Sequence, residues 1–216
     1  MMLLAATGLR REGRILRGTG VRVILGGGDQ RRLEAELDQA APQADGVISI
    51  GIAGALAPGL RPGDWVVADA VGEVRADPGW AARLTEVLEA RRGSIAGTDA
   101  MVAEAAGKAA LHQATGALAV DMESHVAARV AQRHGLPFAA ARVISDAADH
   151  TLPPAARVGM RPDGGMDLPA VLRSLAADPR QLPALIRTGI AAERAFRALL
   201  RGYRRLGPRL GRSVLG

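Results

Sequence analysis

The chain has 216 residues, of which 48% are hydrophobic, and no apolar run long enough to span a membrane, so we expect one domain with a well-buried core. It contains no Cys, which excludes disulfides, thiolate nucleophiles and cysteine metal sites. The first residues lack the charged start of a signal peptide, and a cytoplasmic protein is expected.

The net charge of +6 is unevenly placed. Residues 180–212 hold nine Arg and one Glu, so this end carries +8 and the remainder −2. Aromatic residues, which would stack on bases, make up only 2% of the chain. A near-neutral body with one basic end argues against a nucleic-acid partner. Lys108 is the one Lys among 28 basic residues, which we attribute to genomic base composition.

Short β-type runs alternate with helical patterns along the first two thirds of the chain. Strands are predicted at 2–6, 21–25, 46–51, 65–71, 93–98, 116–121 and 138–145. Helices are predicted at 29–40, 78–91, 100–114, 122–134 and 182–206. This order predicts an α/β single-domain, three-layer fold, with a mixed, mostly parallel central sheet flanked by helices. The Pro- and Gly-rich stretch 151–178 is interpreted as a loop or linker, which gives a domain over 1–178 and an appendage over 179–216.

Two segments place carboxylates where strands should end. An apolar run precedes Asp121 and Glu123, and a second apolar run, Phe138 to Ile144, precedes Asp146. Ligands of open α/β sheets bind outside the carboxyl ends of the strands. We therefore expect an active site where these acids converge.

The chain resembles the purine and uridine phosphorylase family in several segments that occur in the family's order over residues 1–150. These are Glu12 in the first turn, Ser49-Ile50-Gly51-Ile52-Ala53-Gly54-Ala55-Leu56, Pro62-Gly63-Asp64, Gly97-Thr98-Asp99-Ala100-Met101-Val102, Asp121-Met122-Glu123 and Val143-Ile144-Ser145-Asp146. The resemblance implies a nucleoside phosphorylase or nucleosidase, that is, a pentosyltransferase or N-glycosyl hydrolase. Such an enzyme cleaves an N-ribosidic bond through an oxocarbenium-like transition state and needs no covalent protein nucleophile.

The resemblance also implies roles for the acids. Glu123 would bind both vicinal ribose hydroxyls, beside Met122 as an apolar wall. Asp146 would assist departure of the base by general acid catalysis at N7, with its proton either its own or shared. The alternatives are that Met122 fills the core and that Asp146 caps a turn with Ser145. The expected substrate-binding residues are Met122, Glu123, Ser145, Met101, Val102 and Gly51.

The attacking nucleophile stays open. Glu12 lies where the family's nucleosidases hold a water-activating carboxylate, whereas in phosphorylases this turn helps to hold phosphate. Family phosphorylases commonly carry Ser at the position of Ile52 and Arg at that of Ser49, so their usual phosphate ligands are absent. A phosphate co-substrate would then use other groups, for which we name Gly8, Arg10, Arg11, Gly27, Gly28 and Ser49. The alternatives are a solvated helix start at Glu12 and a tight turn at Gly26 to Gly28.

No cofactor is expected, because neither a dinucleotide fingerprint nor a Walker motif occurs. No metal is expected either, since the four His residues show no ligand spacing. They are His112, His125, His134 and His150.

From Leu182 to Leu206, apolar residues fall on one predicted helical face and Arg residues on another. The apolar face comprises Leu182, Leu185, Phe196, Leu199, Leu200, Tyr203 and Leu206. Such a helix suits an anionic membrane surface, which implies a peripheral location at the inner face of the cytoplasmic membrane. The alternative is that the helix packs on its own domain with a solvated Arg face.

The chain resembles a hopanoid-associated branch of the family in four features. These are its short length, its Arg-rich tail, the segment from Thr7 to Glu12, and Gly26-Gly27-Gly28-Asp29. That resemblance implies adenosylhopane as the substrate and adenine release in hopanoid biosynthesis. Two alternatives are a soluble enzyme for methylthioadenosine, adenosylhomocysteine or purine nucleosides, and a non-catalytic nucleoside- or lipid-binding protein. Family members are often oligomers, so a homo-oligomer is expected.

Overall fold

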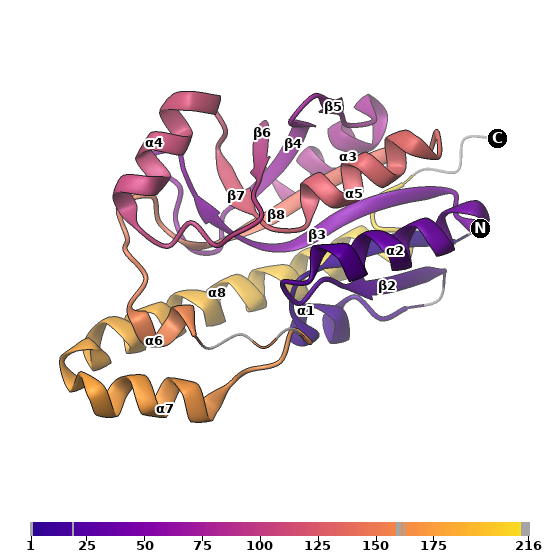
Figure 1. Ribbon diagram of the computed structural model, residues 1–216. Coiled ribbons are helices and arrows are strands. Elements are labelled where there is room, and N and C mark those ends of the chain that lie inside the picture. Colours follow the sequence, from indigo (N-terminus) through magenta and orange to yellow (C-terminus); the bar gives the residue numbers. More distant parts are fainter. Residues whose placement is uncertain (1, 19, 159–160, 162, 213–216) are drawn as a thin grey trace.

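The computed structural model describes residues 2–18, 20–158, 161 and 163–212. Strands and helices alternate along most of this range (Figure 1). The strands are β1 (Leu3–Thr7), β2 (Val21–Leu25), β3 (Gly46–Ala55), β4 (Trp65–Val71), β5 (Val74–Arg75), β6 (Arg91–Gly97), β7 (Ala119–Asp121) and β8 (Phe138–Asp146). The helices are α1 (Arg10–Ile15), α2 (Gln30–Ala40), α3 (Pro78–Leu88), α4 (Ala105–Thr115), α5 (Ser124–Arg133), α6 (Pro154–Arg157), α7 (Leu168–Ala177) and α8 (Leu182–Leu206), with 3₁₀ turns at Ala41–Gln43 and Pro179–Gln181.

The central sheet is mixed and mostly parallel, as predicted. The strand order is β2-β1-β3-β7-β6-β4-β5, and β8 pairs with both β3 and β4. The pairs β3/β7, β4/β8 and β4/β5 are antiparallel, and the other strand pairs are parallel. Because β8 joins β3 to β4, the strands β3, β8, β4, β6 and β7 close into a ring. This closure brings the ends of β3, β7 and β8 together.

Helices cover both faces of the sheet, which confirms the three-layer fold. One core cluster joins β1 and β3 to α2 and α5, through residues such as Leu33, Leu37 and Val126. A second cluster, on the other face, joins β8 and β4 to α3 and α8, through residues such as Trp80, Leu84 and Leu199.

The long helix α8 has the predicted bounds, and its two halves differ in environment. In the second half Phe196, Leu199 and Leu206 are buried against the domain. In the first half Leu182, Ile186 and Ile190 are exposed by 46%, 54% and 52%. The second half is therefore part of the core, and only the first half leaves apolar residues free for another surface. The division between 1–178 and 179–216 stays a prediction.

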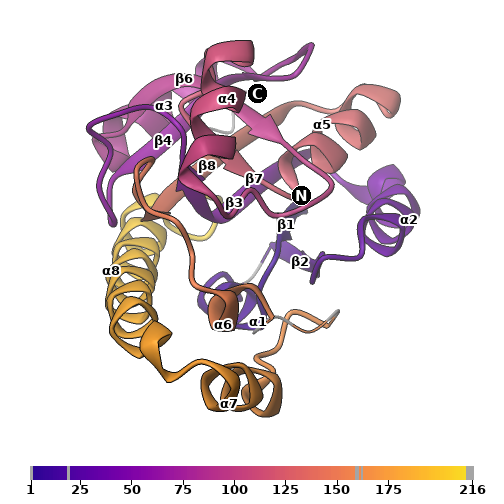
Figure 2. The ribbon, with the colours of Figure 1, turned by 60° about the vertical axis from the view of Figure 1, so that its left-hand side comes forward.

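The interpretation of 151–178 as a loop or linker is wrong in part, because α6 and α7 form there. Asp167 caps α7 by accepting a hydrogen bond from the Ala170 amide at 3.1 Å. Pro169 lies in the first turn, where a helix needs no amide donor, so it does not break α7. The segment between the two helices is tied to α1, since the Arg10 amide donates to the Gly164 carbonyl at 3.0 Å. Figure 2 shows α6, α7 and the start of α8 grouped beside α1.

Candidate active site

A cavity of about 230 Å³ opens where the ends of β1, β3, β7 and β8 meet. Four of its lining residues are acidic and none is basic among those the structure describes. The lining comprises Gly8, Leu9, Glu12, Ile52, Ala53, Gly54, Thr98, Met101, Val102, Val120, Asp121, Met122, Glu123, Ser145, Asp146, Leu152, Ala156, Thr188 and Ala192. The predicted convergence of Asp121, Glu123 and Asp146 is what the structure shows.

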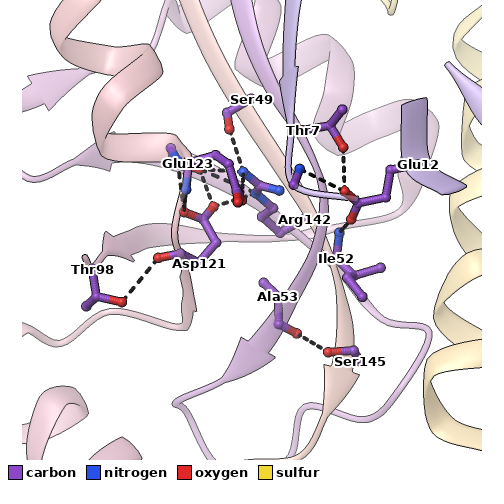
Figure 3. A network of polar contacts seen from close by, with 12 residues as sticks. Thr7, Glu12, Ser49, Ile52, Ala53, Thr98, Asp121, Glu123, Arg142 and Ser145 are labelled. Carbon is purple, nitrogen blue, oxygen red and sulfur yellow. Dashed lines mark hydrogen bonds and ion pairs between the residues drawn. The ribbon is translucent and has the colours of Figure 1, made fainter. Parts of the chain in front are cut away.

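Glu12 is buried at the inner end of this cavity, with 1% of its surface exposed. Its Oε2 accepts hydrogen bonds from the Thr7 hydroxyl and from the amides of Gly8 (2.9 Å) and Leu9 (2.7 Å). Among the described residues, the Ile52 amide is the one donor to its Oε1, at 2.7 Å (Figure 3). A carboxylate oxygen has room for a second donor, so Oε1 can also receive a hydrogen bond from a cavity molecule. The alternative of a solvated helix start at Glu12 is thereby excluded.

Arg142 lies at the centre of the buried polar network and is fully buried. Its Nε pairs with the Asp121 carboxylate at 2.5 Å, and its Nη2 donates to the Ser49 hydroxyl at 2.5 Å and lies 3.5 Å from Glu123 Oε2 (Figure 3). Its Nη1 has no hydrogen-bond partner among the described residues. An unpaired buried donor is costly, so Nη1 is available to a water or ligand.

The charges of the network shift two pKa values. Burial raises the pKa of Glu123 to about 8; the attraction of Arg142 opposes this rise, and repulsion from Asp121 and Glu12 adds to it. Burial alone would lower the pKa of Arg142, but attraction by Asp121, Glu123 and Glu12 outweighs burial and raises it. Glu123 is therefore protonated at neutral pH. A neutral carboxyl can donate to one ribose hydroxyl and accept from the other.

Glycines make room for this cluster. A Cβ on Gly8 would lie 2.7 Å from Glu123 Oε1, and one on Gly26 would lie 3.0 Å from Glu123 Cγ. A Cβ on Gly51 would lie 2.6 Å from Glu12 Oε1 and 2.7 Å from Arg142 Nη1. Gly51 was predicted to bind substrate, but it is not among the cavity-lining residues. Its position instead allows Glu12 and Arg142 to approach one another.

Asp146 lines the cavity and accepts the Ser145 hydroxyl at 2.6 Å. Its Oδ2 also contacts the ammonium of Lys108, a residue with no exposed surface. The sequence interpretation gave Lys108 no functional weight and overlooked Arg142, which lies within an otherwise apolar run. A single charged residue in a buried strand was the available signal for Arg142.

The residues named for phosphate are not brought together by the structure. Arg10 and Arg11 lie outside the cavity lining and pair with Asp163 (2.7 Å) and Glu193 (2.6 Å). Ser49 is fully buried against Arg142.

The glycine turn after β2 is also poorly placed to bind phosphate in the cavity. The Gly27 amide donates to the Gly8 carbonyl at 3.0 Å, and Gly27 and Gly28 are absent from the lining. Of the six residues named, only Gly8 borders the cavity.

The other predicted substrate contacts, Met101, Val102 and Met122, line the cavity with Ser145. The four His residues are scattered, and no group of three or more His, Asp or Glu side chains in the described part of the chain is arranged to hold a metal ion.

The three-layer fold and the acid-lined cavity at its strand ends define a class of α/β proteins with a small-molecule site. The family model of the phosphorylase superfamily matches residues 29–177, and the chain belongs to that superfamily. This result confirms the resemblance seen in the sequence.

Solved structures share the fold at low identity. The S-adenosylhomocysteine nucleosidase from Streptococcus pyogenes, in complex with 5-methylthiotubericidin, aligns with a TM-score of 0.65 at 20% identity, covering 96% of this chain and 98% of the other. The futalosine hydrolase of Helicobacter pylori aligns with a TM-score of 0.68 at 17% identity, covering 95% and 97%. The 5′-methylthioadenosine/S-adenosylhomocysteine nucleosidase from Streptococcus pneumoniae, with a transition-state inhibitor, aligns with a TM-score of 0.60 at 19% identity, covering 94% and 99%.

Proposed function

We propose that the protein hydrolyses the N-ribosidic bond of an adenine nucleoside and releases adenine. The observation that carries this proposal is the cavity lining, which combines four carboxyl groups with no cation among the described residues. The oxocarbenium-like transition state of N-riboside cleavage is positively charged at the sugar. Ionised carboxylates near the sugar stabilise such a charge more than they stabilise the neutral substrate. Glu123, protonated at neutral pH, contributes hydrogen bonds rather than charge.

The same lining favours water over phosphate as the nucleophile. A phosphate anion would meet the carboxyl groups of Glu12 and Asp121, and the two buried cations beside the cavity, Arg142 and Lys108, are already paired with acidic side chains. Water needs one acceptor and one donor. Glu12 Oε1 has a free acceptor site, and Arg142 Nη1, on the same side of Gly51, is a donor without a partner among the described residues. Glu12 would take the proton of the attacking water as a general base.

The remaining residues divide between sugar and base. Glu123 would bind the two ribose hydroxyls, with Met122 beside the sugar. Asp146 and Ser145 lie at the end of β8 and would face the base, between the apolar side chains of Met101 and Val102. No cofactor enters this reaction. The proteins of similar structure are nucleosidases and a hydrolase, and this supports the same class of chemistry here.

The test is release of adenine from adenosine, 5′-methylthioadenosine and S-adenosylhomocysteine, followed by chromatography. Asp146→Asn provides the matched inactive control. Adenine release by the wild type that this variant reduces at least about 100-fold would support the proposal. Tight adenine binding without cleavage of any nucleoside would instead favour the non-catalytic alternative.

We further propose that the substrate is a lipid-linked nucleoside, adenosylhopane, drawn from an anionic membrane surface. Two apolar stripes at i, i+4 spacing support this proposal: Leu168 and Leu172 on α7, exposed by 57% and 65%, and Leu182, Ile186 and Ile190 on α8. The opposite side of α8 contributes Thr188 and Ala192 to the cavity. The α8 stripe therefore lies within about one helix diameter, roughly 10 Å, of the site.

Charge around these stripes supports an anionic surface. Arg173, Arg180 and Arg187 are exposed on the same helices and on the turn between them. Exposed apolar residues flanked by Arg are typical of helices that lie in a membrane interface. No helix in the described part of the chain is long and apolar enough to cross a membrane.

Vesicles of phosphatidylglycerol and phosphatidylcholine that carry adenosylhopane test the lipid proposal. Replacing Leu172, Ile186 and Ile190 by Ser should weaken vesicle sedimentation and adenine release from adenosylhopane, but leave adenine release from soluble nucleosides unchanged. Equal loss on both substrates, or unchanged sedimentation, would contradict it. If the triple variant instead changes the oligomeric state, the stripes are a subunit interface, which would suit the predicted homo-oligomer.

A further inference from the structure

Lys108 is the one lysine of the chain, and it is the side chain that α4 buries. Its ammonium contacts Asp146 Oδ2 and donates to the carbonyls of Ala147 (3.0 Å) and His150 (2.8 Å). These three acceptors use all three ammonium hydrogens. Lys108 is therefore fixed in one position, directly behind the carboxyl group that faces the base.

Burying such a pair is expensive, and well-packed apolar residues of similar volume often give equal or greater stability. Stability alone does not explain why a buried helix face carries a lysine here. The contacts of Asp146 indicate a role in the reaction. Both of its oxygens already accept hydrogen bonds, Oδ1 from Ser145 and Oδ2 from Lys108. Both contacts favour an ionised Asp146 that accepts hydrogen bonds. The departing base, however, needs a group that donates a proton to it.

We propose that Lys108 is a positioning residue that supplies, through Asp146, the proton taken up by the leaving base; this inference rests on the proposed function. As the C1′–N9 bond breaks, its electron pair moves to the base. Lys108 Nζ transfers a proton to the Asp146 carboxylate and becomes a neutral amine, and Asp146 passes a proton to the base N7. The attacking water forms the C1′–O bond and gives its proton to Glu12. Exchange with solvent then returns a proton to Lys108 and removes one from Glu12, so the net reaction consumes one water.

The first experiment is a double-mutant cycle on kcat for adenine release, using the soluble nucleoside that the wild type cleaves fastest. Lys108→Met keeps the length of the side chain and removes its charge, and we expect kcat to fall about 100-fold or more. In the Asp146→Asn background, Lys108→Met should change kcat less than about threefold, because the proton path is already cut. Equal losses in the two backgrounds would overturn the inference. If Lys108→Met alone does not fold, the double variant and Asp146→Asn still give this second comparison, because the double variant has neither buried charge and Lys108 in Asp146→Asn keeps the carbonyls of Ala147 and His150. A change in kcat above about threefold between these two variants would then overturn the inference.

The second experiment measures binding of two free bases by calorimetry and is independent of turnover. 9-Deazaadenine carries an N–H at position 7, and 7-deazaadenine carries a C–H there. An Asp146 held as an acceptor by Lys108 should bind 9-deazaadenine about 10-fold or more tightly than 7-deazaadenine in the wild type. In Lys108→Met this preference should fall to within about threefold. A purely structural role for Lys108 would weaken both bases alike and keep the ratio.

The two proposals can fail separately. A wild type that releases adenine while Lys108→Met retains both kcat and the base preference overturns the role of Lys108 alone. A wild type that neither releases adenine nor binds either base overturns the proposed function, and the role of Lys108 with it.

Discussion

Glu12 Oε1 accepts the backbone amide of Ile52 at 2.7 Å, a link between the first helix and the glycine-rich strand forty residues later. The link fixes Glu12 against the end of β3 and leaves one acceptor site of that oxygen open to the cavity. In Glu12→Gln one carboxylate oxygen becomes an NH₂ group, which cannot accept hydrogen bonds. This NH₂ group must face either the Ile52 amide or the three donors at Oε2, so at least one of those donors loses its acceptor. We expect kcat to fall at least about 100-fold, because Gln is not a base.

Binding of 7-deazaadenine, measured by isothermal titration calorimetry, is the control for this variant, because the proposed site for the nucleobase is separate from Glu12. Its affinity should stay within about threefold of the wild type. A Glu12→Gln enzyme with normal turnover would remove Glu12 from the mechanism.

Gly51→Ala should displace Glu12 and Arg142 although Gly51 itself does not line the cavity. The added methyl group would lie 2.6 Å from Glu12 Oε1 and 2.7 Å from Arg142 Nη1, so both groups must move. We expect a loss of about 1–3 kcal/mol in the free energy of unfolding, together with reduced turnover. Gly189→Ala is the matched control, because a Cβ there meets no atom within 4 Å and Ala is the better helix former. It should stabilise the protein by up to about 1 kcal/mol. Equal urea midpoints for the two variants would contradict the crowding around Gly51.

Glu123 should make stability depend on pH. Burial raises the pKa of Glu123 from 4.5 to about 8, so the folded protein keeps a proton that the unfolded chain releases between these values. The free energy of unfolding should therefore fall as pH rises from about 5 to about 8, by up to roughly 1.4 kcal/mol per pH unit from this group, and level off above it. Glu123→Gln has no such proton, and its stability should fall less steeply over that interval. Urea unfolding of both proteins at several pH values checks this, and parallel curves would show that Glu123 is ionised throughout.

The two halves of α8 should respond differently to truncation of a side chain. Leu199 is fully buried in the second half, and Leu199→Ala should cost about 2–5 kcal/mol. Ile190 is 52% exposed in the first half, and Ile190→Ala should change stability by about 0.5 kcal/mol or less. Urea denaturation distinguishes them. An unchanged midpoint for Leu199→Ala would mean that the helix is a detachable appendage after all.

The sequence predicted the regular elements well because their signals are local. The bounds of α8 and β4 follow from periodicity, and Asp121, Glu123 and Asp146 follow from positions at strand ends. Local patterns carry no information on the pairing of β8 with both β3 and β4, which closes the ring. They also misled at α7, because the Pro- and Gly-rich stretch 151–178 was interpreted as a loop or linker.

The site shows the same division. Glu12, Glu123 and Asp146 were found through motifs, whereas Arg142 and Lys108 were missed because both are buried charged residues, whose positions hydrophobic patterns do not reveal. The basic residues near the first turn, Arg10 and Arg11, looked suited to phosphate on charge alone. Their acidic partners Asp163 and Glu193 come from distant segments, and only the fold brings them together.

The sugar product shows whether water or phosphate attacks C1′ of the nucleoside. The wild type would be incubated with a cleavable adenine nucleoside in ¹⁸O-water with saturating inorganic phosphate, and the sugar product analysed by mass spectrometry. Hydrolysis at Glu12 predicts a free sugar with one ¹⁸O at C1′, at a rate that does not depend on phosphate. A sugar 1-phosphate formed only when phosphate is present would show that phosphate, and not water, is the nucleophile.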